Sequence, residues 1–135
     1  MTSSLDPAQL ESAKALLLER LAPEIVVLFG SAATGRGFGP DSDIDLGFLC
    51  QRSPGKYDCF MLAQELAGIL GRDVDLVDLG QASTVFKKEI LAGSKFLYES
   101  DPIRAMDWRM RALKEYAKLN EERAPVLKAR FKQNG

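Results

Sequence analysis

The stretch from Gly30 to Leu46 reads GSAATGRGFGPDSDIDL and places four glycines and three aspartates between two apolar runs. The run before it, from Glu24 to Phe29, is short and rich in β-branched residues, which is typical of a buried strand. Apolar residues resume at Ile44, in alternation with Asp43 and Asp45. Because alternate side chains of a strand share a face, we expect both carboxylates on one face and the apolar residues on the core side.

Two carboxylates on one face repel each other unless a cation or a donor lies between them. Magnesium suits this position, since it prefers oxygen ligands and fills its remaining sites with water and substrate phosphate. The segment from Asp73 to Leu79 reads DVDLVDL and repeats the acidic strand pattern. If this strand lies beside the first one, Asp75 joins Asp43 and Asp45 in a cluster that can hold two metal ions for nucleotidyl transfer. Asp75 is then the acid best placed to activate an attacking hydroxyl.

Gly30 and Ser31 supply the phosphate-binding half of this predicted site. A chain that leaves a strand through Gly-Ser into a short helical turn presents free N–H groups to phosphate oxygens. The glycines at 35, 37 and 39 allow the loop backbone to approach a triphosphate closely. The loop has neither the lysine of a P-loop nor the strand–helix context of a dinucleotide fingerprint. Each motif alone also fits a common structural role: Gly-Ser as a turn, Asp-x-Asp as a solvated strand edge, and the glycines as a flexible loop.

Length and composition limit the possible classes of protein. The 135 residues match one domain, and 46% hydrophobic with 27% charged residues is typical of a soluble globular chain. We expect no membrane span and no secretory signal, and therefore a cytoplasmic location. The absence of histidine excludes Ser-His-Asp and Cys-His chemistry, and a net charge of -1 gives no case for binding a nucleic-acid polymer. The cysteines at 50 and 59 are expected to be packing residues.

The order of elements predicts an α/β fold with a mixed sheet of about four or five strands and flanking helices. We expect strands at 24–29, 44–50, 73–79 and 95–99, and helices that begin at Asp6, Ser53, Ser83 and Asp101. The whole chain, 1–135, is expected to be a single domain with a core at about 24–100 and a C-terminal helical segment at about 102–133. Pro125 should kink or end that last helix. Its basic tail with Lys128, Arg130 and Lys132 fits a solvated terminus or a partner contact, and Trp108 and Tyr116 fit either a partner contact or core packing.

The segments LFGSAATGRGFGPDSDIDL and DVDLVDL together resemble the minimal nucleotidyltransferases of the DNA polymerase β superfamily. The resemblance runs from about Ile25 to Tyr98, and the residues after DVDLVDL are similar to the MntA antitoxin branch of that family. It implies that Gly30 and Ser31 bind nucleotide phosphate and that Asp43, Asp45 and Asp75 bind metal. The spacer from Ala32 to Ser42 has eleven residues, one more than is usual in the family. Asp41 therefore offers an alternative register, but it lies in loop-like sequence, whereas Asp43 and Asp45 flank apolar strand residues.

The resemblance also implies a biological role. Proteins of this branch are paired with HEPN-domain (HepT-like) ribonuclease toxins, and the implied reaction is the transfer of AMP from ATP, with Mg²⁺, to a tyrosine of the toxin. Two alternatives remain open from the sequence. One is a nucleotidyltransferase that modifies a small molecule such as an antibiotic, although 135 residues leave little room for an acceptor pocket. The other is a non-catalytic antitoxin that neutralises its toxin by binding alone.

Overall fold

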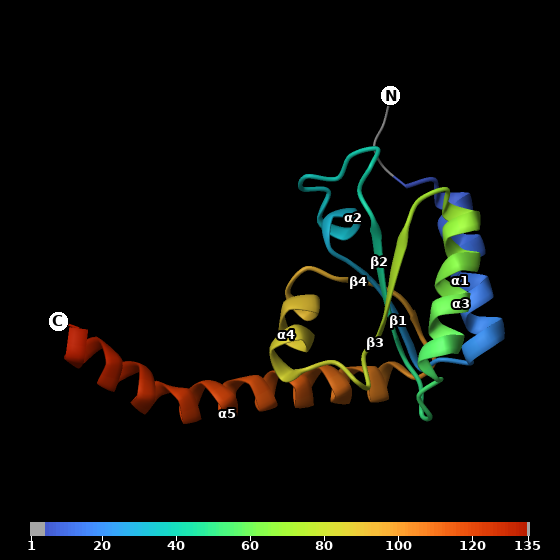
Figure 1. Ribbon diagram of the computed structural model, residues 1–135. Helices are drawn as coiled ribbons and strands as arrows, with labels where there is room; N and C mark the ends of the chain where they lie inside the picture. Colours follow the sequence, from blue (N-terminus) through green and yellow to red (C-terminus); the bar gives the residue numbers. More distant parts are fainter. Residues whose placement is uncertain (1–4, 135) are drawn as a thin grey trace.

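The computed structural model describes residues 5–134 of the chain, with side chains described as far as Ala124. Four strands and five helices alternate along the sequence (Figure 1), as the element order predicts. Their bounds are α1 Pro7–Leu21, β1 Ile25–Phe29, α2 Ser31–Thr34, β2 Ile44–Leu49, α3 Lys56–Leu70, β3 Val74–Asp78, α4 Thr84–Ala92, β4 Lys95–Glu99 and α5 Pro102–Asn134.

The sheet is mixed and has the strand order β3-β2-β1-β4. Strand β1 pairs antiparallel with both β2 and β4, whereas β2 and β3 are parallel. A parallel neighbour requires a crossover connection, and α3 supplies it between β2 and β3. This connection brings the two acidic strands side by side and in the same direction.

Each face of the sheet carries its own apolar cluster. Helices α1 and α3 pack together over one face (Figure 1), on Val26, Leu28, Ile44 and Leu46. The other face packs its cluster against α4 and α5, with Trp108 partly buried in it. Trp108 therefore packs against the core, which was one of the two roles that the sequence left open.

Helix starts agree with the sequence at three of the four expected positions. Asp6, Ser83 and Asp101 each accept a hydrogen bond from a first-turn N–H group, at 2.9, 3.1 and 3.0 Å. The exception is α3, which was expected to begin at Ser53. Its N-cap residue is Gly55, which has no side chain to cap the helix. Of the two effects expected of Pro125, a kink or an end of the helix, the second is wrong, because α5 continues to Asn134. A proline removes one backbone hydrogen bond, and a helix this long can continue past that loss. The side chains of the basic tail lie outside the described residues.

Replacing Ala22 with glycine should stabilise the protein by about 0.5–1 kcal/mol. Ala22 ends α1 in the left-handed region, with φ 44°. A side chain there costs about 1–2 kcal/mol, which glycine relieves at a smaller cost in unfolded-state entropy. The midpoint of urea unfolding should therefore rise. A lower midpoint would show that the alanine is not strained.

Candidate active site

Two of the three predicted acids are direct neighbours across the parallel strand pair. Asp45 is the second residue of β2, and its register partner in β3 is Asp75. Residues paired in this way point to the same face of a sheet. Asp43 immediately precedes β2 and is exposed. The parallel register therefore brings Asp45 and Asp75 together on the face that α4 and α5 cover farther along the strands.

The environment of Asp45 disfavours its negative charge. Burial raises the pKa of its carboxyl most, and the charges of Asp75 and then Asp43 raise it further. These two acids therefore lie close enough to act on Asp45 through their charges. A cation bound here, alone or together with phosphate, would stabilise the negative charge of Asp45 and lower its pKa.

The three carboxylates do not form a closed cluster. Among the described residues, no group of three or more Asp, Glu, Cys or His side chains is arranged to hold a metal ion. Asp43 instead lines a hollow of about 540 Å³ with Asp41, Arg72 and Asp73. Like charges with no cation between them repel each other, which is consistent with this open arrangement.

Gly30 joins β1 to α2 and lies against Asp45. Its φ of 68° and ψ of -155° belong to a region that is essentially restricted to glycine. A Cβ at this position would collide with the carboxylate of Asp45. Because Gly30 has no side chain, the backbone of the turn can lie directly against the carboxylate of Asp45. In the first turn of α2, the N–H groups of Ser31 and Ala32 have no partner within the helix, which leaves them available to an anion beside Asp45.

Arg72 is a residue of this region that the sequence patterns did not identify. Its guanidinium donates to the carbonyl oxygens of Gly39 at 2.5 Å and Ser42 at 3.2 Å. It also stacks over the ring of Phe38, 4.4 Å from the centroid. Ser42 immediately precedes Asp43, so Arg72 fixes the loop that carries this acid. No short motif marks a contact between residues about thirty positions apart, and only the folded chain brings them together.

If Asp43 binds metal as the sequence predicts, replacing Arg72 with alanine should lower the rate of nucleotidyl transfer by about 10- to 100-fold, the usual effect of losing a group that orients a metal ligand. Lysine should restore only part of the rate, because it lacks the planar fork that reaches two carbonyls and stacks on a ring. Initial rates at saturating substrate would measure the effect. The control is Arg111→Ala, which removes an exposed arginine that pairs with Asp107 on α5. Equal rates for both alanine variants would contradict this role of Arg72.

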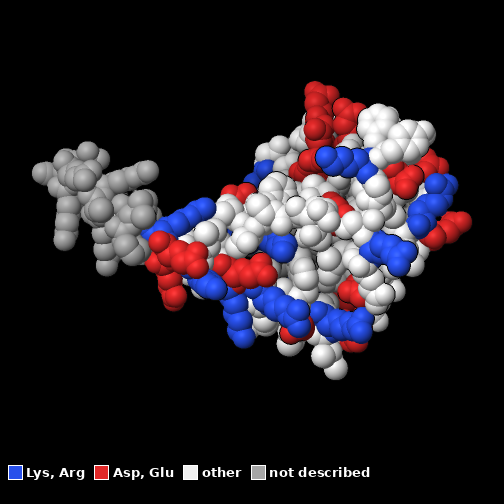
Figure 2. All heavy atoms as spheres, turned by 60° about the horizontal axis from the view of Figure 1, so that its bottom comes forward, with Lys and Arg blue, Asp and Glu red and all other residues white. Residues whose placement is uncertain are grey.

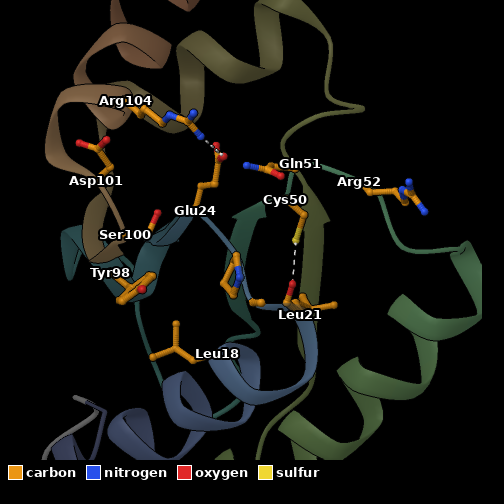
Figure 3. A pocket seen from close by; sticks show the side chains of 12 residues that line it. Leu18, Leu21, Glu24, Cys50, Gln51, Arg52, Tyr98, Ser100, Asp101 and Arg104 are labelled. Atoms are coloured by element: carbon orange, nitrogen blue, oxygen red, sulfur yellow. Dashed lines mark hydrogen bonds and ion pairs between the residues drawn. The ribbon is translucent and has the colours of Figure 1, made fainter.

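A hollow larger than the one beside Asp43 lies elsewhere. It measures about 660 Å³ and contains the ion pair between Arg104 and Glu24, 3.1 Å apart (Figure 3). Glu24 precedes β1 and Cys50 follows β2, so this hollow is about 17 Å from Asp45 along the strand.

Burial raises the pKa of the Cys50 thiol to about 11, which keeps it protonated at neutral pH. Both cysteines are free and half-buried, and the packing role expected from the sequence stays a prediction.

Residues 11–103 match the protein family described as Polymerase beta, Nucleotidyltransferase. Together with the paired acids and the Gly-Ser turn, this match defines the class: the chain belongs to the polymerase β-type nucleotidyltransferase family. Within it, the chain is 32% identical over 104 residues to the protein adenylyltransferase MntA of Shewanella oneidensis, covering 77% of this chain and 73% of that protein.

Solved structures extend the similarity to the fold. A chain from a complex of a tri-AMPylated Shewanella oneidensis HEPN toxin with an MNT antitoxin superposes with a TM-score of 0.77 at 26% identity, covering 92% of this chain and 97% of that one. A chain from a toxin–antitoxin structure with AMP-PNP gives a TM-score of 0.77 at 30% identity, covering 90% and 98%. The nucleotidyltransferase fold predicted from the sequence is therefore confirmed, down to the long C-terminal helix.

Two further surface properties bear on the expected partners. None of the helices in the described part of the chain combines the length and apolar character needed to cross a membrane. On the face that carries α5, Lys and Arg side chains are interspersed with Asp and Glu, with uncharged surface between them (Figure 2). This face offers no uniform basic field of the kind that binds a nucleic-acid backbone.

Proposed function

We propose that this protein is an antitoxin that transfers AMP from ATP to a tyrosine of a partner HEPN-family ribonuclease toxin and thereby inactivates the toxin. The observation that carries the proposal is the register of Asp45 with Asp75 beside the turn at Gly30 and Ser31. The relatives add support, since one is named a protein adenylyltransferase and another was solved with a tri-AMPylated HEPN toxin. A reaction that uses ATP and a ribonuclease target is consistent with a cytoplasmic location.

The donor set fits Mg²⁺. Asp43, Asp45 and Asp75 offer only carboxylate oxygens, which are the ligands this ion prefers. The raised pKa of Asp45, caused by burial and by its two acidic neighbours, marks a position where positive charge is favourable. When bound, such ions stabilise negative charge on the entering and leaving oxygens of an in-line displacement. The first-turn N–H groups of α2 and the hydroxyl of Ser31 would hold phosphate oxygens.

The chain's own residues account for the remaining steps. The acceptor hydroxyl forms a bond to the α-phosphorus, and the bond from that phosphorus to the bridging oxygen breaks, so that pyrophosphate leaves. Asp75, the exposed residue of strand β3, is the acid best placed to accept the hydroxyl proton. Asp45 is more enclosed, with Gly30 against its carboxylate, and would hold the cation that neutralises charge on the reacting phosphate.

The test is to incubate the purified protein with ATP, Mg²⁺ and the partner toxin and to measure the intact mass of the toxin. The proposal predicts increments of one AMP on a toxin tyrosine. Modification of an aminoglycoside in the absence of a protein acceptor would instead support a small-molecule transferase. Neutralisation of the toxin with no added mass would support an antitoxin that acts by binding alone. Either of these results would contradict the proposed reaction.

A further inference from the structure

Strand β3 lies at the edge of the sheet, with β2 on one side and, within residues 5–134, no strand on the other. The backbone of Asp73 accepts from Ile44 at 2.9 Å, and the N–H of Leu79 donates to Phe48 at 2.8 Å. In a parallel pair, the residues bonded to the neighbouring strand alternate along the chain. The N–H and C=O groups of Val74 and Leu76 therefore point away from the sheet, which leaves them free to pair with another strand.

This open edge has an apolar hollow on each side. One hollow, of about 450 Å³, lies between β3 and α4 and is lined by Ala82 and the exposed ring of Phe86. The other, of about 510 Å³, lies between β3 and α3 and is lined by Ala63 and by Phe60, which is 61% exposed. Asp75 lines both hollows. The edge, the two hollows and the proposed base are thus one continuous surface.

We infer that the edge of β3 binds the protein acceptor as an extended segment, which adds a strand to the sheet and presents its tyrosine hydroxyl at Asp75. An extended chain matches both features, because its backbone pairs with Val74 and Leu76 while its alternate side chains enter the hollows on opposite faces. This inference rests on the proposed function and identifies the surface that selects the acceptor.

The charge of the edge indicates which segment binds there. Asp75 and Asp78 line both hollows, and Lys56 is the one basic side chain among the described residues that line them. A segment with neutral or basic residues around its tyrosine complements this surface. Edge-to-edge pairing with a second copy would bring the same acidic residues together, which is unfavourable. The acceptor segment is therefore the better occupant.

Kinetics provide the first test. Phe60→Ala and Phe86→Ala should each raise the KM for the toxin by about 10-fold, a loss of about 1.4 kcal/mol in binding, and leave the KM for ATP unchanged. The Phe60 variant is easier to interpret, because an exposed side chain contributes little to the stability of the fold. Phe86 also packs edge-on against Phe29, with 6.1 Å between the ring centroids. The matched control is Ile103→Ala on α5, which is 81% exposed and lines neither hollow. An unchanged KM for the toxin in Phe60→Ala, or an equal rise in Ile103→Ala, would overturn the inference.

Amide hydrogen exchange provides a second test that requires no catalysis. The probe is the partner toxin with its acceptor tyrosine replaced by phenylalanine, added to the wild-type protein. The amides of Val74 and Leu76 should exchange at least about 10-fold more slowly in the complex. Protection that appears without toxin and grows with protein concentration would overturn the inference in favour of self-pairing. AMP transfer to the unaltered toxin, combined with no protection by the phenylalanine variant, would overturn this assignment alone. Failure of the unaltered toxin to bind would overturn the proposed function as well.

Discussion

Replacing Asp45 with asparagine should reduce AMP transfer on the order of 10³-fold, equivalent to about 4 kcal/mol of transition-state stabilisation. Asparagine keeps the shape of the side chain but removes the charge that would hold a metal ion beside the phosphate. Asp45 is enclosed by Gly30 and lies in register with Asp75, so no other described carboxylate occupies its place. Initial rates with ATP and the partner toxin would measure the loss.

The same substitution should raise the melting temperature in metal-free buffer at neutral pH. Burial, followed by the charges of Asp75 and Asp43, raises the pKa of Asp45 in the folded protein. The folded state therefore binds this proton more tightly than the unfolded state does, and stability falls as the pH rises through the folded pKa. The Asp45→Asn variant carries no titrating group at this position and would not suffer this loss. The difference in melting temperature between the two proteins should then disappear at acidic pH, where Asp45 is protonated in both states.

The matched control is Asp41→Asn, which also tests the alternative register of the acidic motif. Asp41 is exposed in the loop that precedes β2, and we expect its loss to change the transfer rate by less than about 3-fold. A large loss of activity in Asp41→Asn with full activity in Asp45→Asn would show that the Asp-x-Asp motif is formed by Asp41 and Asp43.

Replacing Gly30 with alanine should both destabilise the fold and strongly slow transfer. The added methyl group would collide with the carboxylate of Asp45 and would occupy a backbone region that is nearly closed to L-residues. Strain and overpacking together cost about 2–5 kcal/mol. The remaining folded molecules would carry a displaced Asp45, so their transfer rate should also fall on the order of 10²-fold. Urea unfolding and rates normalised to the folded fraction separate the two effects.

Gly35→Ala is the control for backbone strain alone. Gly35 also has a positive φ, of 76°, but no atom lies within 4 Å of a Cβ built there. Its replacement should cost about 1 kcal/mol and leave the normalised rate nearly unchanged. If the two alanine variants lost equal stability and equal activity, the contact between Gly30 and Asp45 would have no special role.

The sequence predicted most of the fold because its local signals agree with one another. The apolar run at 24–29 and the alternation at 44–50 and 73–79 correspond to β1, β2 and β3, each within a residue or two. Ser83 caps α4, as its place before a periodic apolar segment indicates. The side chain of Asp78 stabilises the turn after β3, since it accepts a hydrogen bond from the N–H of Gly80 at 2.9 Å. These are short-range effects, and short-range patterns report them well.

Contacts between residues that are distant in the sequence were harder to predict from the sequence. The alternation of DVDLVDL placed Asp75 on one face of its strand, but only the parallel pairing shows that it faces Asp45. Arg72 donates hydrogen bonds to the loop before Asp43, and hollows lie on both sides of β3. Both features depend on contacts between distant parts of the chain, which a local sequence pattern does not predict. The role of Tyr116 was equally undecided by sequence, and the structure places Lys88 over its ring at 5.3 Å.

The most direct test of the proposed site is a crystal structure of the protein with Mn²⁺ and a non-hydrolysable ATP analogue, using the anomalous signal of manganese. We predict manganese bound by Asp45 and Asp75, with Asp43 drawn toward it, and nucleotide phosphates at the turn of Gly30 and Ser31. Nucleotide bound instead in the hollow between Glu24 and Arg104, with no manganese at the acids, would contradict the account.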